Sequence, residues 1–80
     1  MRILFFGKLR DTLGECVEVA SDRGETIAQL RRRLTALHPE ASDMLLGPLT
    51  RACVGDSIVA EDFVLTGEES VEFLPPVSGG

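Results

Sequence analysis

The residues best suited to chemistry lie at the end of the sequence, in the run Pro75-Pro76-Val77-Ser78-Gly79-Gly80. Two residues without a Cβ atom can enter a narrow channel and lie close to other groups. The reactive group there would be the carboxylate of Gly80, which is a poor electrophile. Another protein would have to activate it with ATP, as an acyl-adenylate, before a nucleophile could attack. A terminal diglycine taken alone is weak evidence, because chain termini are usually poorly ordered.

The proline pair before the glycines gives this tail more weight. Proline has no amide donor and therefore cannot join a central strand. It also stiffens an extended segment. We therefore expect a last strand over Val71 to Leu74, followed by an extended tail over residues 75–80.

No other part of the sequence offers a convincing active site. Cys16 and Cys53 are far apart and have no nearby cysteine or histidine partner, so we expect two buried, reduced thiols and no metal site. The lone His38 precedes Pro39, where a surface or helix-capping role is expected. The thirteen carboxylates are most simply a solvated surface.

Charge and size limit the partners. The net charge is −5, which disfavours nucleic acid and suits a partner with a basic docking face. The one basic run, Arg31-Arg32-Arg33, is expected on a solvated helix face, with docking as the lesser possibility. No apolar run approaches the roughly 20 residues that span a bilayer. No export signal is recognisable at the N-terminus, so the expected compartment is the cytoplasm.

The first part of the sequence predicts two strands. Arg2 to Phe6 is apolar and aromatic, and Cys16 to Ala20 alternates so that Val17 and Val19 would face a core. Between them, Gly7 to Gly14 is expected to be a polar connection. Strand, connection and strand together indicate a hairpin.

A helix follows, beginning after Thr26. Thr26 and Gln29 have the spacing of a capping box. Pro39 ends the helix, because proline disfavours helical geometry in the residue before it. Four apolar residues recur on one helix face: Ile27, Leu30, Leu34 and Leu37.

The second half predicts short elements. A helical turn is expected over Ala41 to Leu46. Strands over Thr50 to Val54 and Ser57 to Val59 would be joined by a tight turn. Between the last two strands, Phe63 and Leu65 are expected to anchor the core.

The 80 residues, 44% of them hydrophobic, are expected to form one domain. The element order β-β-α-β-β-β, with one striped helix, predicts an α+β fold in which a mixed sheet carries one main helix across it. This is the β-grasp, or ubiquitin-like, arrangement. We assign residues 1–74 to it and residues 75–80 to the tail.

These residues resemble a known family, the small subunit of molybdopterin synthase, which is a ubiquitin-like sulfur carrier. The resemblance covers the whole chain. It rests on the opening run of residues 3–14, on the helix start at residues 25–30 and above all on Val71-Glu72-Phe73-Leu74-Pro75-Pro76-Val77-Ser78-Gly79-Gly80.

The resemblance implies a reaction cycle in which Gly80 carries sulfur. An E1-like adenylating enzyme would use ATP to activate Gly80, and a sulfur donor protein would convert it to a thiocarboxylate. The tail would then enter the large synthase subunit and give sulfur to cyclic pyranopterin monophosphate. Gly79 would give access. Docking residues would be Phe73, Leu74, Pro75 and Pro76. The chain itself would bind no cofactor and would act as a co-substrate, since the catalytic side chains are expected on the large subunit.

Three alternatives stay open. A carrier of the same fold could feed thiamine or cysteine biosynthesis. A protein modifier could be attached to lysines through Gly80, because the first activation step is shared. The third alternative is an interaction domain whose tail has no function.

Overall fold

The computed structural model describes residues 1–20 and 23–75. The strands are β1 (Arg2–Phe5), β2 (Cys16–Glu18), β3 (Arg51–Val54), β4 (Ser57–Val59) and β5 (Ser70–Leu74). The helices are α1 (Lys8–Leu13), α2 (Ile27–Leu37), the 3₁₀ turn η1 (Pro39–Ala41) and α3 (Ser42–Leu45). None of the helices in this part of the chain is long and apolar enough to cross a membrane.

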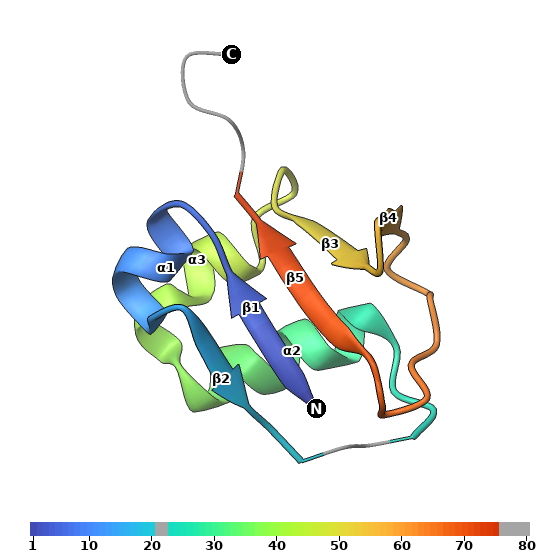
Figure 1. Cartoon of the computed structure of the whole chain (residues 1–80). Coiled ribbons are helices and arrows are strands. Elements are labelled where there is room, and N and C mark those ends of the chain that lie inside the picture. The colour runs from blue at the N-terminus through green and yellow to red at the C-terminus, as the bar shows by residue number, and fades with distance from the viewer. Residues whose placement is uncertain (21–22, 76–80) are drawn as a thin grey trace.

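The five strands form one mixed sheet in the order β2-β1-β5-β3-β4. Strand β5 lies in the middle, parallel to β1 and antiparallel to β3. Figure 1 shows α2 crossing one face of this sheet. The predicted α+β, β-grasp fold is confirmed.

The core lies between the sheet and α2. Ile3 and Phe5 of β1 and Val71 and Phe73 of β5 point toward the helix, because alternate strand residues share a face. The helix contributes three fully buried residues: Ile27, Leu30 and Leu34. Burying a large apolar side chain stabilises a fold by about 1.5–3 kcal/mol. The two central strands and one helix stripe therefore supply much of the stability.

The start and end of α2 follow the sequence prediction. The Gln29 amide donates to the Thr26 hydroxyl at 3.2 Å, and the Thr26 amide donates to the Gln29 side-chain oxygen at 2.9 Å. This reciprocal pair is the predicted capping box. The helix ends at Leu37, with His38 as its C-cap directly before Pro39.

Three expectations about local structure are wrong. The stretch between Gly7 and Gly14 is the helix α1 and not a polar connection, and its Leu9 is fully buried. Leu37, the last residue of α2, is 57% exposed and does not continue the buried stripe. Phe63 is 36% exposed, whereas Leu65 is buried as expected.

Candidate functional site

The C-terminal end of β5 is where the predicted tail begins. Strand β5 runs between β1 and β3, and its described continuation ends at Pro75 (Figure 1). Pro76, Gly79 and Gly80 lie outside the described residues. The structure therefore defines the base from which a tail would leave.

Phe73 fixes that base from inside the core. Its side chain is fully buried, and its ring stacks on Phe5 of the neighbouring strand with 6.3 Å between ring centroids. The guanidinium carbon of Arg31 lies 5.2 Å from the centroid of the Phe73 ring, within cation–π range. Because it is buried, Phe73 offers no surface to a partner. It holds the end of β5 in place, so the contribution to docking that is expected of Phe73, which stays a prediction, would act through the position of that strand end.

Leu74 and Pro75 are half-buried at the surface, as a docking segment requires. Pro75 lies against Gly7, where a Cβ atom would come within 2.7 Å of the Pro75 ring. Gly7 also has a φ of +60°, which side chains rarely tolerate. The turn between β1 and α1 thus lets the chain pass closely at the point where β5 ends. The docking role of Leu74 and Pro75 stays a prediction.

Arg31 is the main feature that the sequence interpretation missed. We expected it on a solvated face, but it is buried. Its guanidinium donates to the Leu45 carbonyl at 2.7 Å and to the Thr50 carbonyl, and it forms an ion pair with Glu61 at 2.8 Å. Arg31 therefore joins α2 to the end of α3, to the start of β3 and to the chain after β4.

The other two arginines of the run differ from Arg31. Arg33 forms a two-pronged ion pair with Glu25, with nitrogen–oxygen distances of 2.7 and 3.0 Å, and Glu25 is buried. Arg32 is exposed, as predicted for the whole run. At about 100° per residue, Arg31 lies only about 40° from Ile27 around the helix. Helix geometry alone could have placed Arg31 at the border of the apolar stripe.

The two cysteines also differ. Cys53 on β3 is buried, and this burial raises the pKa of its thiol, with a further contribution from the nearby Glu72 carboxylate. A raised pKa keeps the thiol protonated and makes it a poor nucleophile. Cys16 is exposed on the edge strand β2, so the expectation of a buried thiol is wrong there.

Within the described part of the chain, the other polar groups do not form a cluster suited to chemistry: Arg2 and Glu18, for example, pair across β1 and β2 at 3.3 Å. Across residues 1–20 and 23–75, no three histidine, cysteine or acidic side chains gather as a metal site would require. His38 caps α2 and lies 3.7 Å from Glu40.

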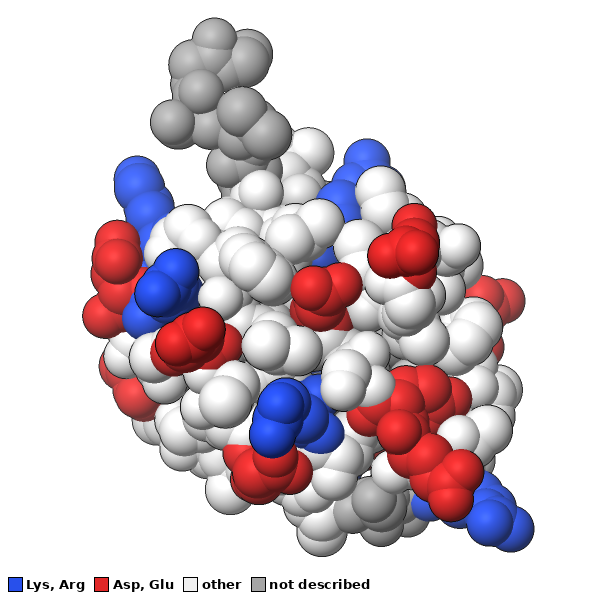
Figure 2. Space-filling model, in the orientation of Figure 1, with Lys and Arg blue, Asp and Glu red and all other residues white. Residues whose placement is uncertain are grey.

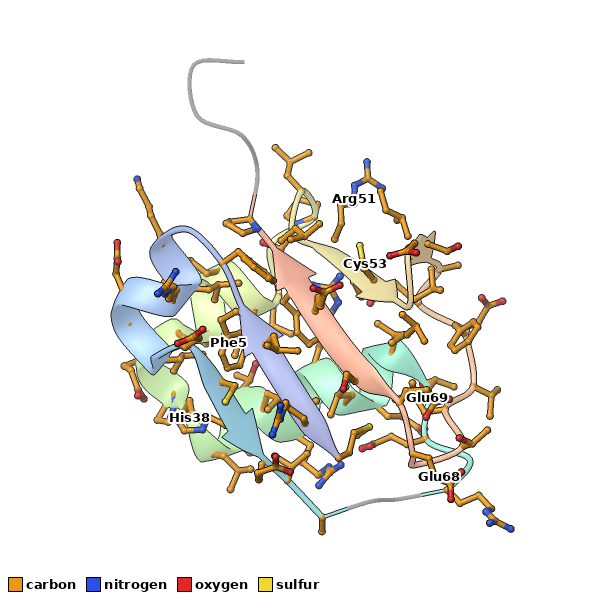
Figure 3. The ribbon with its side chains drawn as sticks, in the orientation of Figure 1. Phe5, His38, Arg51, Cys53, Glu68 and Glu69 are labelled. Carbon is orange, nitrogen blue, oxygen red and sulfur yellow. The ribbon has the colours of Figure 1, made fainter. Side chains whose placement is uncertain are left out.

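Glu69, labelled in Figure 3, lies at the end of the loop before β5. Its carboxylate accepts hydrogen bonds from the amides of Thr66 and Gly67. Burial alone would raise the pKa of Glu69, but these bonds outweigh it and lower the pKa.

The face of the sheet opposite α2 is mixed in character. Figure 2 shows mainly uncharged side chains near the end of β5, with acidic and basic residues around them. Ile58 of β4 is 64% exposed and is the register partner of Cys53. Ile58 lies on the edge strand β4, separated from β5 by β3.

Comparison with known proteins gives a consistent result. The model of the ThiS family matches residues 3–80. The molybdopterin synthase sulfur carrier subunit of Escherichia coli (strain K12) is 33% identical over 81 residues, which cover 100% of this chain and 99% of that protein.

Two solved structures share the fold. SAMP1 from Haloferax volcanii superposes with a TM-score of 0.85 at 21% identity, over 99% of this chain and 97% of that one. A putative molybdopterin converting factor, subunit 1, from Pyrococcus furiosus gives a TM-score of 0.79 at 18% identity, over 95% of each chain. At these identities the likeness establishes the fold alone.

Proposed function

Because the chain belongs to the ThiS family, we propose that it is the sulfur-carrier small subunit of molybdopterin synthase. The observation that carries this proposal is the full-length match, at 33% identity, to the Escherichia coli sulfur carrier subunit. The family match extends to Gly80, so it includes the diglycine.

The proposed chemistry takes place on the carboxylate of Gly80. A carboxylate oxygen attacks the α-phosphorus of ATP on an E1-like adenylating enzyme, and pyrophosphate leaves. A sulfide equivalent (HS⁻) delivered by a donor protein then attacks the acyl carbon and displaces AMP, which leaves a thiocarboxylate with no change of oxidation state. The sulfur is finally transferred to cyclic pyranopterin monophosphate on the large subunit, in the cytoplasm. The partners supply the ATP site and the catalytic side chains.

The described residues contribute position to this cycle. Phe73, stacked on Phe5 and covered by Arg31, fixes the end of the central strand. Leu74 and Pro75 then lie at the surface, where the large subunit would contact them. A firmly held base reduces the conformational freedom that is lost when the tail enters a partner. This arrangement supports a carrier whose reactive end is presented by a rigid domain.

The intact mass of the protein isolated from its own cells tests the proposal. We expect the chain to end at Gly80, with a fraction in which one oxygen is replaced by sulfur. Deletion of Gly79 and Gly80 is expected to abolish synthesis of the molybdenum cofactor. Cofactor synthesis by the truncated chain would contradict the proposal.

Protein isolated from its own cells also distinguishes two related functions, sulfur supply to thiamine biosynthesis and protein modification. Capture of a thiazole synthase in place of the large subunit would assign the chain to thiamine biosynthesis. Isopeptide adducts on cellular lysines would identify a protein modifier. The likeness to SAMP1 does not favour the second function, because it rests on the fold.

A further inference from the structure

A groove of about 410 Å³ lies between α2 and the β3–β4 hairpin. Its volume falls within the range of about 300–1,000 Å³ that is typical of ligand sites. The residues that matter for its character are Arg31, Arg32, Leu46, Pro48, Arg51 and Val59.

The groove carries positive charge on an acidic protein. The net charge of the chain is −5, yet three arginines line this one groove. Arg31 is already bound to Glu61 and to two carbonyl groups. Arg32 and Arg51 are exposed, and neither forms an ion pair with any residue in 1–20 or 23–75. Two exposed arginines of the lining are thus available to acidic groups from outside.

The apolar residues of the groove indicate which kind of anion would bind there. Leu46 is 53% exposed, and Pro48 and Val59 add further apolar surface. Glu61 also lines the groove and would repel a doubly charged phosphate. Carboxylates, which carry one charge each, fit both the arginines and the apolar residues when an apolar side chain lies beside them. Arginine suits such a group because its planar fork matches a carboxylate.

The position of the groove indicates which molecule brings these carboxylates. Arg51 is the register partner of Leu74, the last residue of β5. Figure 3 shows Arg51 at the end of β3 that adjoins the base of the tail. A protein that binds the tail would therefore cover surface close to the groove, because Arg51 lies opposite the last residue of β5.

We propose that this groove docks an acidic and apolar segment of the protein that receives the tail. Acidic side chains of that segment bind Arg32 and Arg51 separately, and an apolar side chain packs on Leu46 and Pro48. The inference rests on the proposed function, because it requires a tail-receiving partner.

Charge reversal on the groove tests this docking. The probe is the purified large subunit of molybdopterin synthase from the same organism, titrated with the full chain by calorimetry. Arg32→Glu and Arg51→Glu are each expected to weaken binding about tenfold, because each removes one attraction and adds one repulsion. Both side chains are exposed, so neither change should disturb folding. The matched control is Arg23→Glu, an exposed arginine outside this groove, which should change affinity less than about twofold.

A second pair of variants tests the apolar wall. Leu46→Ser is expected to weaken binding about fivefold, since it removes apolar area from the contact. Leu37→Ser is the control, because Leu37 is 57% exposed but does not line the groove. It should bind like the unmodified chain.

The outcomes separate this inference from the proposed function. If Arg32→Glu and Arg51→Glu bind as tightly as Arg23→Glu, while binding still depends on Gly79 and Gly80, the docking inference is wrong and the carrier function stands. The same conclusion follows if inorganic phosphate shifts the Arg32 and Arg51 side-chain NMR signals but the variants bind normally, since the groove would then hold a free anion. If the unmodified chain fails to bind the large subunit at all, both the docking inference and the proposed function are overturned.

Discussion

Two consecutive stretches of the chain are held in place by different forces. Strand β5 is fixed by apolar burial, with Val71 and Phe73 fully inside the core and ladders to strands on both sides. The loop before it, residues 60–69, has Leu65 as its one fully buried large side chain. Its other anchors are polar, including backbone bonds from Ile27 to Phe63 and from Leu65 to Glu25.

The difference indicates how the base of the tail is positioned. Apolar burial is strong but not directional, so it fixes the depth of β5 in the sheet. Hydrogen bonds are weaker in net terms but specific in geometry, so they fix the path by which the loop reaches β5. Arg31 links the two stretches, since it covers Phe73 and binds Glu61.

The sharpest test compares the aromatic residue of each stretch. Phe73→Ala is expected to lower the free energy of unfolding by about 3–5 kcal/mol, because it leaves a cavity in the core. Phe63→Ala, at a position that is 36% exposed, should cost about 1 kcal/mol or less. Urea unfolding followed by circular dichroism measures both values.

If Phe73→Ala does not fold, Phe73→Leu keeps the comparison measurable, with an expected loss of about 1–2 kcal/mol. Equal losses for the two alanine variants would mean that β5 and the loop are anchored alike, and the contrast would fail.

The next test removes the link between the two stretches. Arg31→Met keeps most of the side-chain volume but leaves the Leu45 and Thr50 carbonyls without this donor and Glu61 without its cation. We expect a loss of about 2–4 kcal/mol, since buried groups left unpaired are costly. Arg32→Met should stay within about 0.5 kcal/mol of the unmodified chain, because Arg32 is exposed. Chemical denaturation of both variants measures these losses. An unchanged free energy of unfolding in Arg31→Met would show that Arg31 does not stabilise the link between the loop and β5.

The contrast also explains which parts of the fold the sequence predicts. The stripe from Ile27 to Leu34, the Thr26 cap and the alternation of Val71 and Phe73 depend on local spacing, and all three agree with the structure. The exposure of Leu37 and Phe63 depends on where the sheet and the helix end in space. Spacing along the chain does not contain that information.

In the candidate site, too, some features could be predicted from the sequence and others could not. The tail is inferred from residue type and its docking residues from the family resemblance, and both stay predictions. The contacts of Arg31 with Leu45, Thr50 and Glu61 join residues up to 30 positions apart, so they could not be named. The helix α1 was a missed local signal, because Leu9 and Leu13 have helical i, i+4 spacing.

A smaller effect is expected at the helix start that the loop contacts. Thr26 caps α2 and pairs with Val64 across an isolated bridge. Thr26→Ala should lower the free energy of unfolding by about 1 kcal/mol, the usual cost of losing an N-cap. Gln29→Ala removes only the reciprocal bond and should cost about half as much. Amide exchange should quicken at Gln29 in Thr26→Ala and at Thr26 in Gln29→Ala, because each variant removes the acceptor of that amide. Unchanged exchange at Gln29 in Thr26→Ala would argue against a capping role.

The smallest effect concerns Glu69, where the polar loop meets β5. Hydrogen bonds from Thr66 and Gly67 lower its pKa below the usual value of 4.5, so the folded state favours the charged carboxylate. Its contribution to stability is therefore fully present above the unfolded pKa and is lost as the pH falls through the lower folded pKa. Glu69→Gln should cost less than about 1 kcal/mol at neutral pH, because the side chain is partly exposed. Urea unfolding across the acid range should show this difference shrinking below about pH 4. The control is Glu68→Gln, at the exposed neighbouring position, whose curve of unfolding free energy against pH should run parallel to that of the unmodified chain. A Glu69→Gln curve that is also parallel would show that the carboxylate charge does not hold the loop, and the loop would then depend on Leu65 and its backbone bonds.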